Sequence, residues 1–222
     1  MKILVLGDIH GRLIWSDIIT KEQPDKIIFL GDYVSSHDNI PGEQQLANLE
    51  DILNLKESRP NDVILLRGNH DLQHMGYYWA SCSGLNRVVL NNFPRKRFEK
   101  LTQWIYIYDH TLFSHAGVSQ VWLDNCHIKV EEINNMPIDE HFAFTPDNRR
   151  DYCGESKTQS PVWIRPWTLI ECKADGDWIQ VIGHTTVEKC QTIRDDKNIW
   201  LCDALRYSSY LIIDDKFEER KL

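Results

Sequence analysis

Side chains that can bind a metal ion recur in this sequence directly after short apolar segments. Five such segments end in this way, and glycine stands beside most of the endings. The side chains are Asp8 and His10, Asp32, Asn69 and His70, His115, and His184. Carboxylate, imidazole and amide groups without a thiolate favour borderline-hard ions such as Mn²⁺, Fe or Zn²⁺ over a structural zinc site built from cysteines. The pattern therefore indicates a metal centre assembled from distant parts of the chain.

The first of these segments shows why the position of the side chains matters. Residues 3–6 are a continuous apolar run, typical of a strand buried on both faces, and the run stops at Gly7. Asp8 and His10 are two residues apart, so they project from the same side of an extended chain. Asp8 could instead cap the following helix, with His10 in a solvated turn. The four later endings favour half of a metal site at the carboxyl end of a strand, where open α/β sheets bind their ligands.

The strands that carry the first three endings are predicted from apolar runs at residues 3–6, 26–30 and 62–66. Residues 12–20 and 41–56 have apolar side chains at helical spacing and are predicted to be helices between those strands. This order describes a βαβαβ unit with parallel strands. Because Asp32 follows the middle strand, its carboxylate could bridge two ions, and a pair of ions can clamp a phosphate and activate a water molecule.

The second half of the chain has shorter and more varied segments. We predict a hairpin from two strands at 104–108 and 111–115, and a further strand at 178–182. Three strands near the C-terminus are assigned to a second sheet, at 192–193, 199–202 and 210–213. Residues 127–160 are polar and rich in Asn, Asp and Arg, which predicts a loop-and-helix insertion near the mouth of the site.

The composition suits a single domain spanning residues 1–222, with 42% hydrophobic residues and enough length for a substantial core. No apolar run approaches the roughly 20 residues that cross a bilayer. Six scattered cysteines without a CxxC pair suit a reduced, cytoplasmic protein. The net charge of −8 argues against a broad nucleic-acid surface, but it is compatible with a phosphorylated substrate held by a few arginines. The sequence carries no signal for an oligomeric state.

Five motifs connect the endings to a known family. GDIHG (7–11), GDYV (31–34), GNHD (68–71), SHAG (114–117) and GHT (183–185) stand in this order along the chain. In order and spacing they resemble the motifs of the calcineurin-like metallophosphoesterases. Within that superfamily the chain is most similar to bacterial and phage-type serine/threonine protein phosphatases and their diadenosine-tetraphosphatase relatives, which place a phosphate-binding arginine in a context like Trp163-Ile164-Arg165.

The resemblance implies a four-layer α/β/β/α sandwich of two mixed sheets, with two divalent ions at the strand ends. Mn²⁺ is the expected ion, with Fe or Zn²⁺ as alternatives. By motif, Asp8, His10 and Asp32 would hold the first ion. The second ion would be bound by Asp32 as the bridge and by Asn69, His115 and His184. Thr186 stands where nuclease branches have a further histidine, so the first ion is expected to keep more water.

The resemblance also implies the reaction, a direct attack of a metal-bridging hydroxide on a phosphomonoester of a protein or small molecule. His70 would protonate the leaving oxygen, and Arg165 would bind the phosphoryl oxygens. Protein phosphatases carry Asp-Arg where this chain has Ser35-Ser36, and that aspartate would have oriented the general acid. Ser35, Asp38 or Asp71 could take over this task, and we include Asp71 among the expected catalytic residues.

Two other functions remain open at this point. The same pair of ions could hydrolyse phosphoanhydrides in dinucleoside polyphosphates or other nucleotides. The chain could also be a non-catalytic module that binds metal and phosphate, although every ligand position is filled. His37 and Asp203 are given no role in the chemistry.

Overall fold

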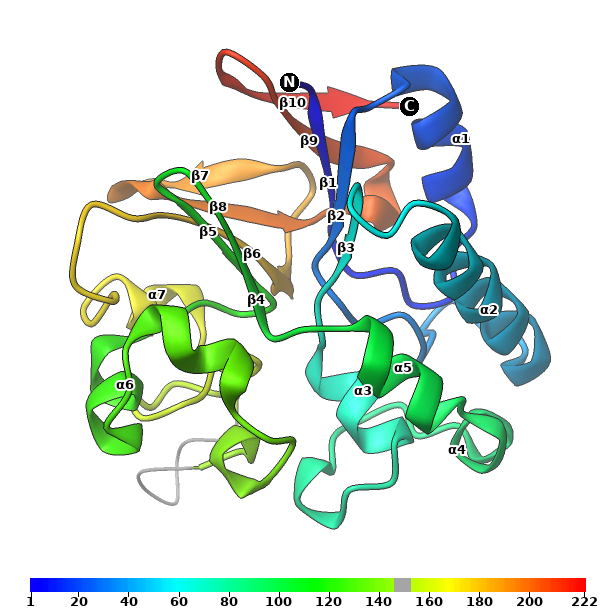
Figure 1. Cartoon of the computed structure of the whole chain (residues 1–222), viewed down its shortest axis with the longest axis horizontal. Helices are drawn as coiled ribbons and strands as arrows, with labels where there is room; N and C mark the ends of the chain where they lie inside the picture. The colour runs from blue at the N-terminus through cyan, green and yellow to red at the C-terminus, as the bar shows by residue number, and fades with distance from the viewer. Residues whose placement is uncertain (146–152) are drawn as a thin grey trace.

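Two five-stranded mixed sheets, packed face to face, form the centre of the molecule (Figure 1). The computed structural model describes residues 1–145 and 153–222. The first sheet has the order β10-β9-β1-β2-β3 and the second has the order β4-β5-β6-β8-β7. Helices lie outside the sheets, which confirms the predicted α/β sandwich. Among the described residues, no helix combines the length and apolar character needed to cross a membrane.

The first sheet is built around β1 (Ile3–Leu6), which pairs in parallel with β2 (Lys26–Phe29). Next comes β3 (Val63–Leu65), also parallel, so the predicted βαβαβ unit is confirmed. Alternate residues of these strands face opposite ways. Ile3 and Val5 pack against the second sheet, whereas Leu4 and Leu6 pack against helices. Burial on both faces explains why each strand reads as an unbroken apolar run.

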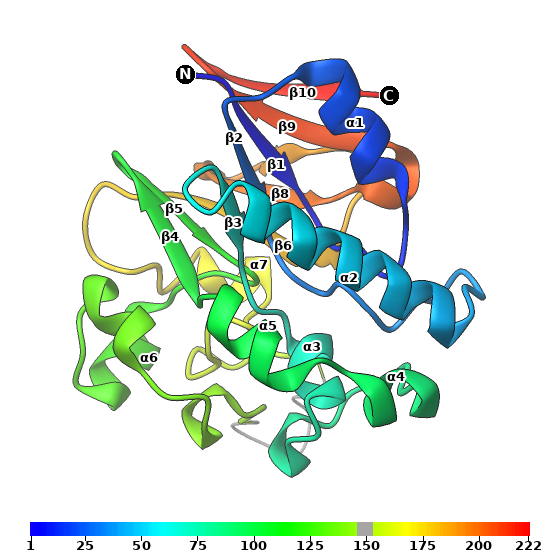
Figure 2. The same ribbon diagram turned by 45° about the vertical axis from the view of Figure 1, so that its right-hand side comes forward.

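Helices α1 (Ile14–Glu22) and α2 (Gly42–Ser58) cover the outer face of the first sheet (Figure 2). Leu49, Ile52 and Leu53 of α2 are fully buried, and their spacing places them on one side of the helix. The remaining helices lie away from this face and have the following bounds: α3 (Asn69–His74), α4 (Arg87–Asn92), α5 (Arg95–Leu101), α6 (Gln120–Cys126) and α7 (Pro166–Leu169). Four short 3₁₀ turns complete the helical elements: η1 (Tyr78–Ala80), η2 (Val130–Asn135), η3 (Glu140–Phe142) and η4 (Leu205–Tyr207).

The second sheet begins with the predicted hairpin of β4 (Ile105–Tyr108) and β5 (Thr111–Ser114). β5 pairs in parallel with β6 (Ile179–Thr186), and β6 pairs in parallel with β8 (Asp196–Asp203). The edge strand β7 (Gln191–Ile193) is antiparallel to β8. Three parallel strands therefore bring their carboxyl ends to one edge of this sheet.

The assignment of residues 210–213 to the second sheet is wrong. They lie in β9 (Ser209–Ile213), which pairs antiparallel with β1 in the first sheet. Tyr210 faces the helices and Leu211 faces the other sheet, so β9 is buried on both faces and its apolar pattern does not distinguish the two sheets. The edge strand β10 (Phe217–Lys221) was not predicted, because its half-buried and mostly charged side chains hide the strand signal.

The predicted insertion at 127–160 contains η2 and η3, and residues 146–152 lie outside the described part of the chain. Val130, Ile133 and Phe142 of this segment are buried, and the ring of Phe142 stacks on that of Trp104 with centroids 3.5 Å apart. The described residues of the segment therefore share the core of the sandwich. That the whole chain is one domain stays a prediction.

The two sheets approach most closely where β1 and β8 end. A Cβ atom added to Gly7 would lie 1.9 Å from the carbonyl oxygen of Cys202 and 2.9 Å from the Cα of Asp203. Only a residue without a side chain fits between these backbones. The contact brings Asp8, the next residue after Gly7, beside the end of β8.

We predict that Gly7→Ala destabilises the protein more than Gly176→Ala does. The first substitution forces two backbones apart, at a cost of about 3 kcal/mol. Gly176 is exposed with a φ of +113°, so alanine there meets mainly backbone strain, roughly 1–2 kcal/mol. Urea unfolding followed by circular dichroism measures both. Equal losses for the two variants would contradict the close contact between β1 and β8.

Candidate metal centre

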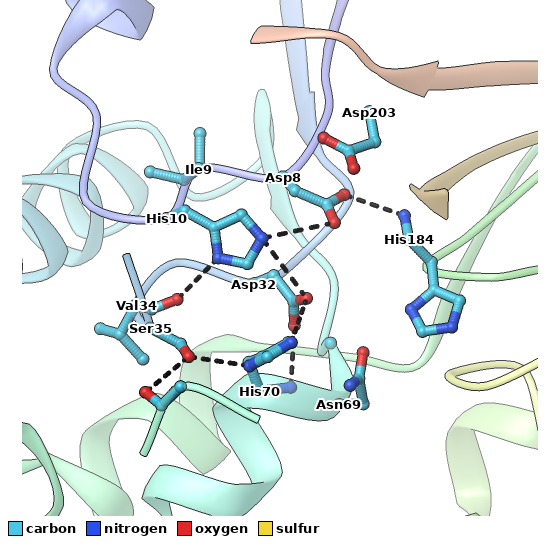
Figure 3. A network of polar contacts seen from close by, with 12 residues as sticks. Asp8, Ile9, His10, Asp32, Val34, Ser35, Asn69, His70, His184 and Asp203 are labelled. Atoms are coloured by element: carbon cyan, nitrogen blue, oxygen red, sulfur yellow. Dashed lines mark hydrogen bonds and ion pairs between the residues drawn. The ribbon is translucent and has the colours of Figure 1, made fainter. Parts of the chain in front are cut away.

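The structure brings all six predicted metal ligands to the carboxyl ends of the parallel strands, and Figure 3 shows five of them, all but His115. Each side chain follows a strand, lies near the end of β6, or begins α3 after β3. A cavity of about 530 Å³ opens on this region, and five of the six side chains line it, while His115 lies fully buried behind. The ligands are Asp8, His10, Asp32, Asn69, His115 and His184.

Asp32 lies at the centre of these side chains. Its Oδ2 lies 3.5 Å from Nε2 of His115 on one side and 4.0 Å from Nε2 of His10 on the other. Its Oδ1 accepts a hydrogen bond from the backbone N–H of His70 at 2.9 Å. The backbone of Asp32 has a φ of +53°, in the left-handed region, which turns the chain after β2 and directs the side chain into the cavity.

The hydrogen bonds of the histidines direct one nitrogen of each ring toward the other predicted ligands. Nδ1 of His10 donates to the carbonyl of Val34 at 3.0 Å, and Nδ1 of His115 donates to that of Leu30 at 2.9 Å. Nε2 of both rings then faces Asp32, and Nε2 of His115 also lies 3.0 Å from Oδ1 of Asn69. Such hydrogen bonds set the tautomer and the direction of metal-binding imidazoles. In His184 the two ring nitrogens exchange these roles. Nε2 lies 3.1 Å from the carbonyl oxygen of Trp163, which leaves Nδ1 to bind a metal ion.

The charges around Asp8 and His10, the expected ligands of the first ion, favour a bound cation. Burial, followed by the negative charges of Asp203 and Asp32, raises the pKa of Asp8 well above its usual value. Burial also lowers the pKa of His10 to about 4, so the ring is neutral at physiological pH. Crowded carboxylates beside neutral imidazoles are the donor set that a divalent metal needs.

A tight cluster fits this requirement. Ligand atoms of Asp8, Asp32 and His115 all lie within 4.8 Å of one another. Asn69 belongs to the same region, since its Oδ1 lies 3.0 Å from Nε2 of His115. The residues present therefore fit a divalent metal centre.

His70 lies next to this cluster without joining it. Its Nδ1 lies 2.8 Å from the hydroxyl of Ser35, and that hydroxyl donates to the carbonyl of Gly84 at 2.9 Å. The Ser35 oxygen therefore accepts from Nδ1–H, which leaves Nε2 of His70 facing Asp32 at 4.0 Å. Burial lowers the pKa of His70, and the charge of Asp32 opposes this effect.

The other two residues considered as partners of His70 lie elsewhere. Asp71 accepts hydrogen bonds from the backbone N–H groups of Gly68, Asp32 and Tyr33, each at 2.9 Å. Its carboxylate therefore braces the backbone around Asp32, and it makes no contact with the His70 ring. Asp38 forms ion pairs with Arg12 at 2.6 Å and Arg206 at 3.4 Å. Of these three residues, Ser35 is the one bonded to the His70 ring, and the sulfur of Cys82 lies 3.5 Å from the same Nδ1.

Arg165 is positioned at the wall of the cavity. Its Nε donates to the carbonyl of Cys153 at 2.5 Å, and Nη1 donates to the carbonyl of His184 at 2.9 Å and to the hydroxyl of Thr185 at 3.1 Å. Burial lowers the pKa of the guanidinium, and the nearby carboxylates oppose that shift. The group is thus a fixed cation facing the metal ligands.

The cavity residues that sequence reasoning missed include His37 and Asp203. The ring of His37 lies 5.6 Å from that of His10 and 6.0 Å from that of His70, measured between centroids. It follows no strand, so the pattern of strand endings does not detect it. Asp203 ends the strand β8, and its apolar run followed by a carboxylate is the same signal that identified Asp8.

Comparisons with known proteins agree with this fold. A family model described as calcineurin-like phosphoesterase matches residues 1–219. Among solved structures, the fold is similar to a cold-active protein-tyrosine phosphatase of a psychrophilic Shewanella species, with a TM-score of 0.67, 14% identity, and coverage of 98% of this chain and 80% of that one. A protein serine/threonine phosphatase from Saccharomyces cerevisiae gives a TM-score of 0.63 and 16% identity, covering 100% of this chain and 80% of the other.

We predict that Asp8→Asn stabilises the metal-free protein. The native pKa of Asp8 lies above its unfolded value, so ionising this group costs stability as the pH rises, and a neutral amide removes that cost. At pH 7 the melting temperature of the metal-free protein should rise by about 2–4 °C, the effect of about 1 kcal/mol in a chain of this size. The increase in melting temperature on adding Mn²⁺ should shrink.

Differential scanning fluorimetry with and without Mn²⁺ measures both effects. Asp51→Asn is the control, because Asp51 is exposed on α2, far from the cavity. An Asp8→Asn variant that melts at a lower temperature without metal, and keeps the full response to Mn²⁺, would refute the assignment.

Proposed function

This chain belongs to the calcineurin-like phosphoesterase family, and we propose that it hydrolyses phosphomonoesters with two divalent ions that share the carboxylate of Asp32. The observation that carries this proposal is the position of Asp32 Oδ2, with Nε2 of His10 at 4.0 Å and Nε2 of His115 at 3.5 Å. One oxygen faces imidazoles from both sheets. A carboxylate between two sets of neutral ligands suits a bridge between two cations.

The ligands divide into two groups around that bridge. Asp8 and His10 would hold the first ion with Asp32, and the second ion would be bound by Asp32, Asn69, His115 and His184. When bound, the two ions would activate a water molecule and neutralise the charge of the phosphoryl group. Oxygen and imidazole ligands support Mn²⁺ as the working ion, with Fe or Zn²⁺ as alternatives.

In this proposal the doubly protonated ring of His70 delivers a proton from Nε2 to the leaving oxygen and returns to the neutral form with its proton on Nδ1. Its Nδ1 is tied to the Ser35 hydroxyl at 2.8 Å, so Nε2 is the atom presented to the cavity. Ser35 would orient the His70 ring as the aspartate of protein phosphatases orients the general acid, with a neutral hydroxyl in place of a charged carboxylate. Asp71 is a positioning residue, because its three hydrogen bonds hold the backbone of Asp32, Tyr33 and Gly68.

Arg165 would bind a phosphoryl oxygen of the substrate. Within the described residues, its three hydrogen bonds use Nε and Nη1, which leaves Nη2 for this contact. A charge-assisted hydrogen bond from a fixed guanidinium strengthens as negative charge develops on the phosphoryl group. The substrate class we propose is a phosphorylated protein side chain or small molecule.

We further propose that the chain works as one domain in the cytoplasm. Support comes from the cysteines, because all six are free thiols and two of them, Cys190 and Cys202, are buried. Free thiols of this kind suit a reducing compartment.

A substrate panel with added Mn²⁺ tests the proposed function. The panel contains p-nitrophenyl phosphate, phosphopeptides and dinucleoside polyphosphates, and the readout is phosphate release or product separation. We expect turnover of the monoesters. Preference for the dinucleotides would replace this proposal by phosphoanhydride hydrolysis, and no turnover of any compound by a metal-loaded protein would favour a binding module.

We predict that His70→Asn lowers kcat by about 10²–10⁴-fold, the usual contribution of a general acid. Because His70 is not a proposed ligand, metal content should stay at the wild-type value. Ser35→Ala should lower kcat less, by about tenfold, because the His70 ring loses one orienting hydrogen bond.

Ser36→Ala is the matched control for the serine substitution. Its hydroxyl accepts from the backbone of Asp38 at 3.0 Å and makes no contact with His70. Steady-state kinetics and elemental analysis of each variant measure rate and metal content separately. Loss of metal together with rate in His70→Asn would show that His70 acts on the metal centre instead of on the leaving group.

A further inference from the structure

Asp203 is a buried carboxylate in the cavity for which the proposed reaction has no use. It ends β8, only 4% of its surface is exposed, and it lines the same cavity as Asp8 and Asp32. Burying a carboxylate is costly unless it is paired or binds a cation. The buried carboxylate of Asp203 therefore needs a hydrogen-bond donor or a cation beside it.

A threonine holds one oxygen of this carboxylate. The hydroxyl of Thr186 donates to Oδ2 of Asp203 at 2.7 Å. The two residues are also register partners in the pairing of β6 with β8, so the contact is fixed by the sheet. In the part of the chain that the structure describes, Oδ1 of Asp203 accepts no hydrogen bond, and Figure 3 shows the carboxylate turned toward Asp8.

Negative charge accumulates on this side of the cavity. Burial, and after it the charge of Asp203, raises the pKa of Asp8, and burial together with the charge of Asp32 raises the pKa of Asp203. Two guanidinium groups lie nearby: Arg12 is paired with Asp38, and Arg165 keeps its charge while Nε and Nη1 donate to backbone carbonyls. Three carboxylates that face one cavity favour a further positive charge between them.

We propose that Asp203 and Thr186 complete the binding site of the first ion, with Asp203 accepting a hydrogen bond from a water molecule on that ion. This inference rests on the proposed function, because it takes Asp8, His10 and Asp32 as the ligands. In this proposal Asp8, His10 and Asp32 hold the positions next to the ion, so Asp203 acts on it through water.

The three protein ligands of the first ion explain why such support is needed. With Asp8, His10 and Asp32 alone, its remaining positions are filled by water, and the orientation of that water depends on acceptors around the site. Thr186 brings no imidazole to the ion, but its hydroxyl directs the carboxylate of Asp203 toward it. Removing a group that orients a metal ligand in this way lowers the affinity for the metal ion by about 10–100-fold.

Isothermal titration of the metal-free full-length protein with Mn²⁺ tests the inference without reference to activity. We expect Asp203→Asn to weaken one of two binding steps by about 10–100-fold and to leave the other unchanged. His10→Asn identifies the first-ion step, because it removes a ligand of that ion alone. Thr186→Val should weaken the same step, and Thr186→Ser, which keeps the hydroxyl, should restore it.

Asp196→Asn is the control, since Asp196 lies at the other end of β8 and pairs with Lys173 outside the cavity. Unchanged affinity in both Asp203→Asn and Thr186→Val, or an equal loss at both steps, would overturn the inference. If Asp203→Asn does not fold, the Mn²⁺ affinity of Thr186→Val at the first-ion step tests the inference in its place. A wild-type protein that binds fewer than two ions would instead refute the proposed function itself.

Discussion

The position of one carboxylate, that of Asp32, governs the rest of the site. Its backbone N–H is held by Asp71, its Oδ1 by the N–H of His70, and its Oδ2 is left facing the imidazoles. A charge buried to this degree, with 1% of the residue exposed, needs compensation. Imidazoles must be neutral to bind a metal ion, so in the metal-bound site the ion itself would supply that compensation.

Close backbone approach makes this concentration of polar groups possible. A Cβ atom on Gly68 would lie 2.1 Å from Oδ1 of Asp32, and one on Gly183 would lie 2.3 Å from Oδ1 of Asp8. Four residues of the site, His10, Asp32, Ser35 and His184, have a positive φ, a conformation that costs energy for residues with side chains. The packed core of the sandwich offsets the energy that these conformations cost. Such local costs are expected at functional sites.

Much of this arrangement could be predicted from sequence, because a buried parallel strand leaves an unbroken apolar run and its carboxyl end is a fixed place in the fold. The metal ligands could therefore be predicted from their positions after these apolar runs. The partner of His70 could not be predicted, since Ser35, Asp38 and Asp71 all carry side chains that can accept a hydrogen bond, and it is the turn at Ser35, with a φ of +70°, that brings one of them to the ring. His37 comes from the same irregular loop. The sheet that contains β9 was also beyond prediction, because its register depends on packing across the whole chain.

The central claim is that two ions share Asp32. Anomalous X-ray diffraction from crystals of the Mn²⁺-loaded protein tests it most directly. The account predicts two anomalous peaks, both within coordination distance of the Asp32 carboxylate, one beside Asp8 and His10 and the other beside His115 and His184. A single peak, or two peaks of which only one contacts Asp32, would contradict it.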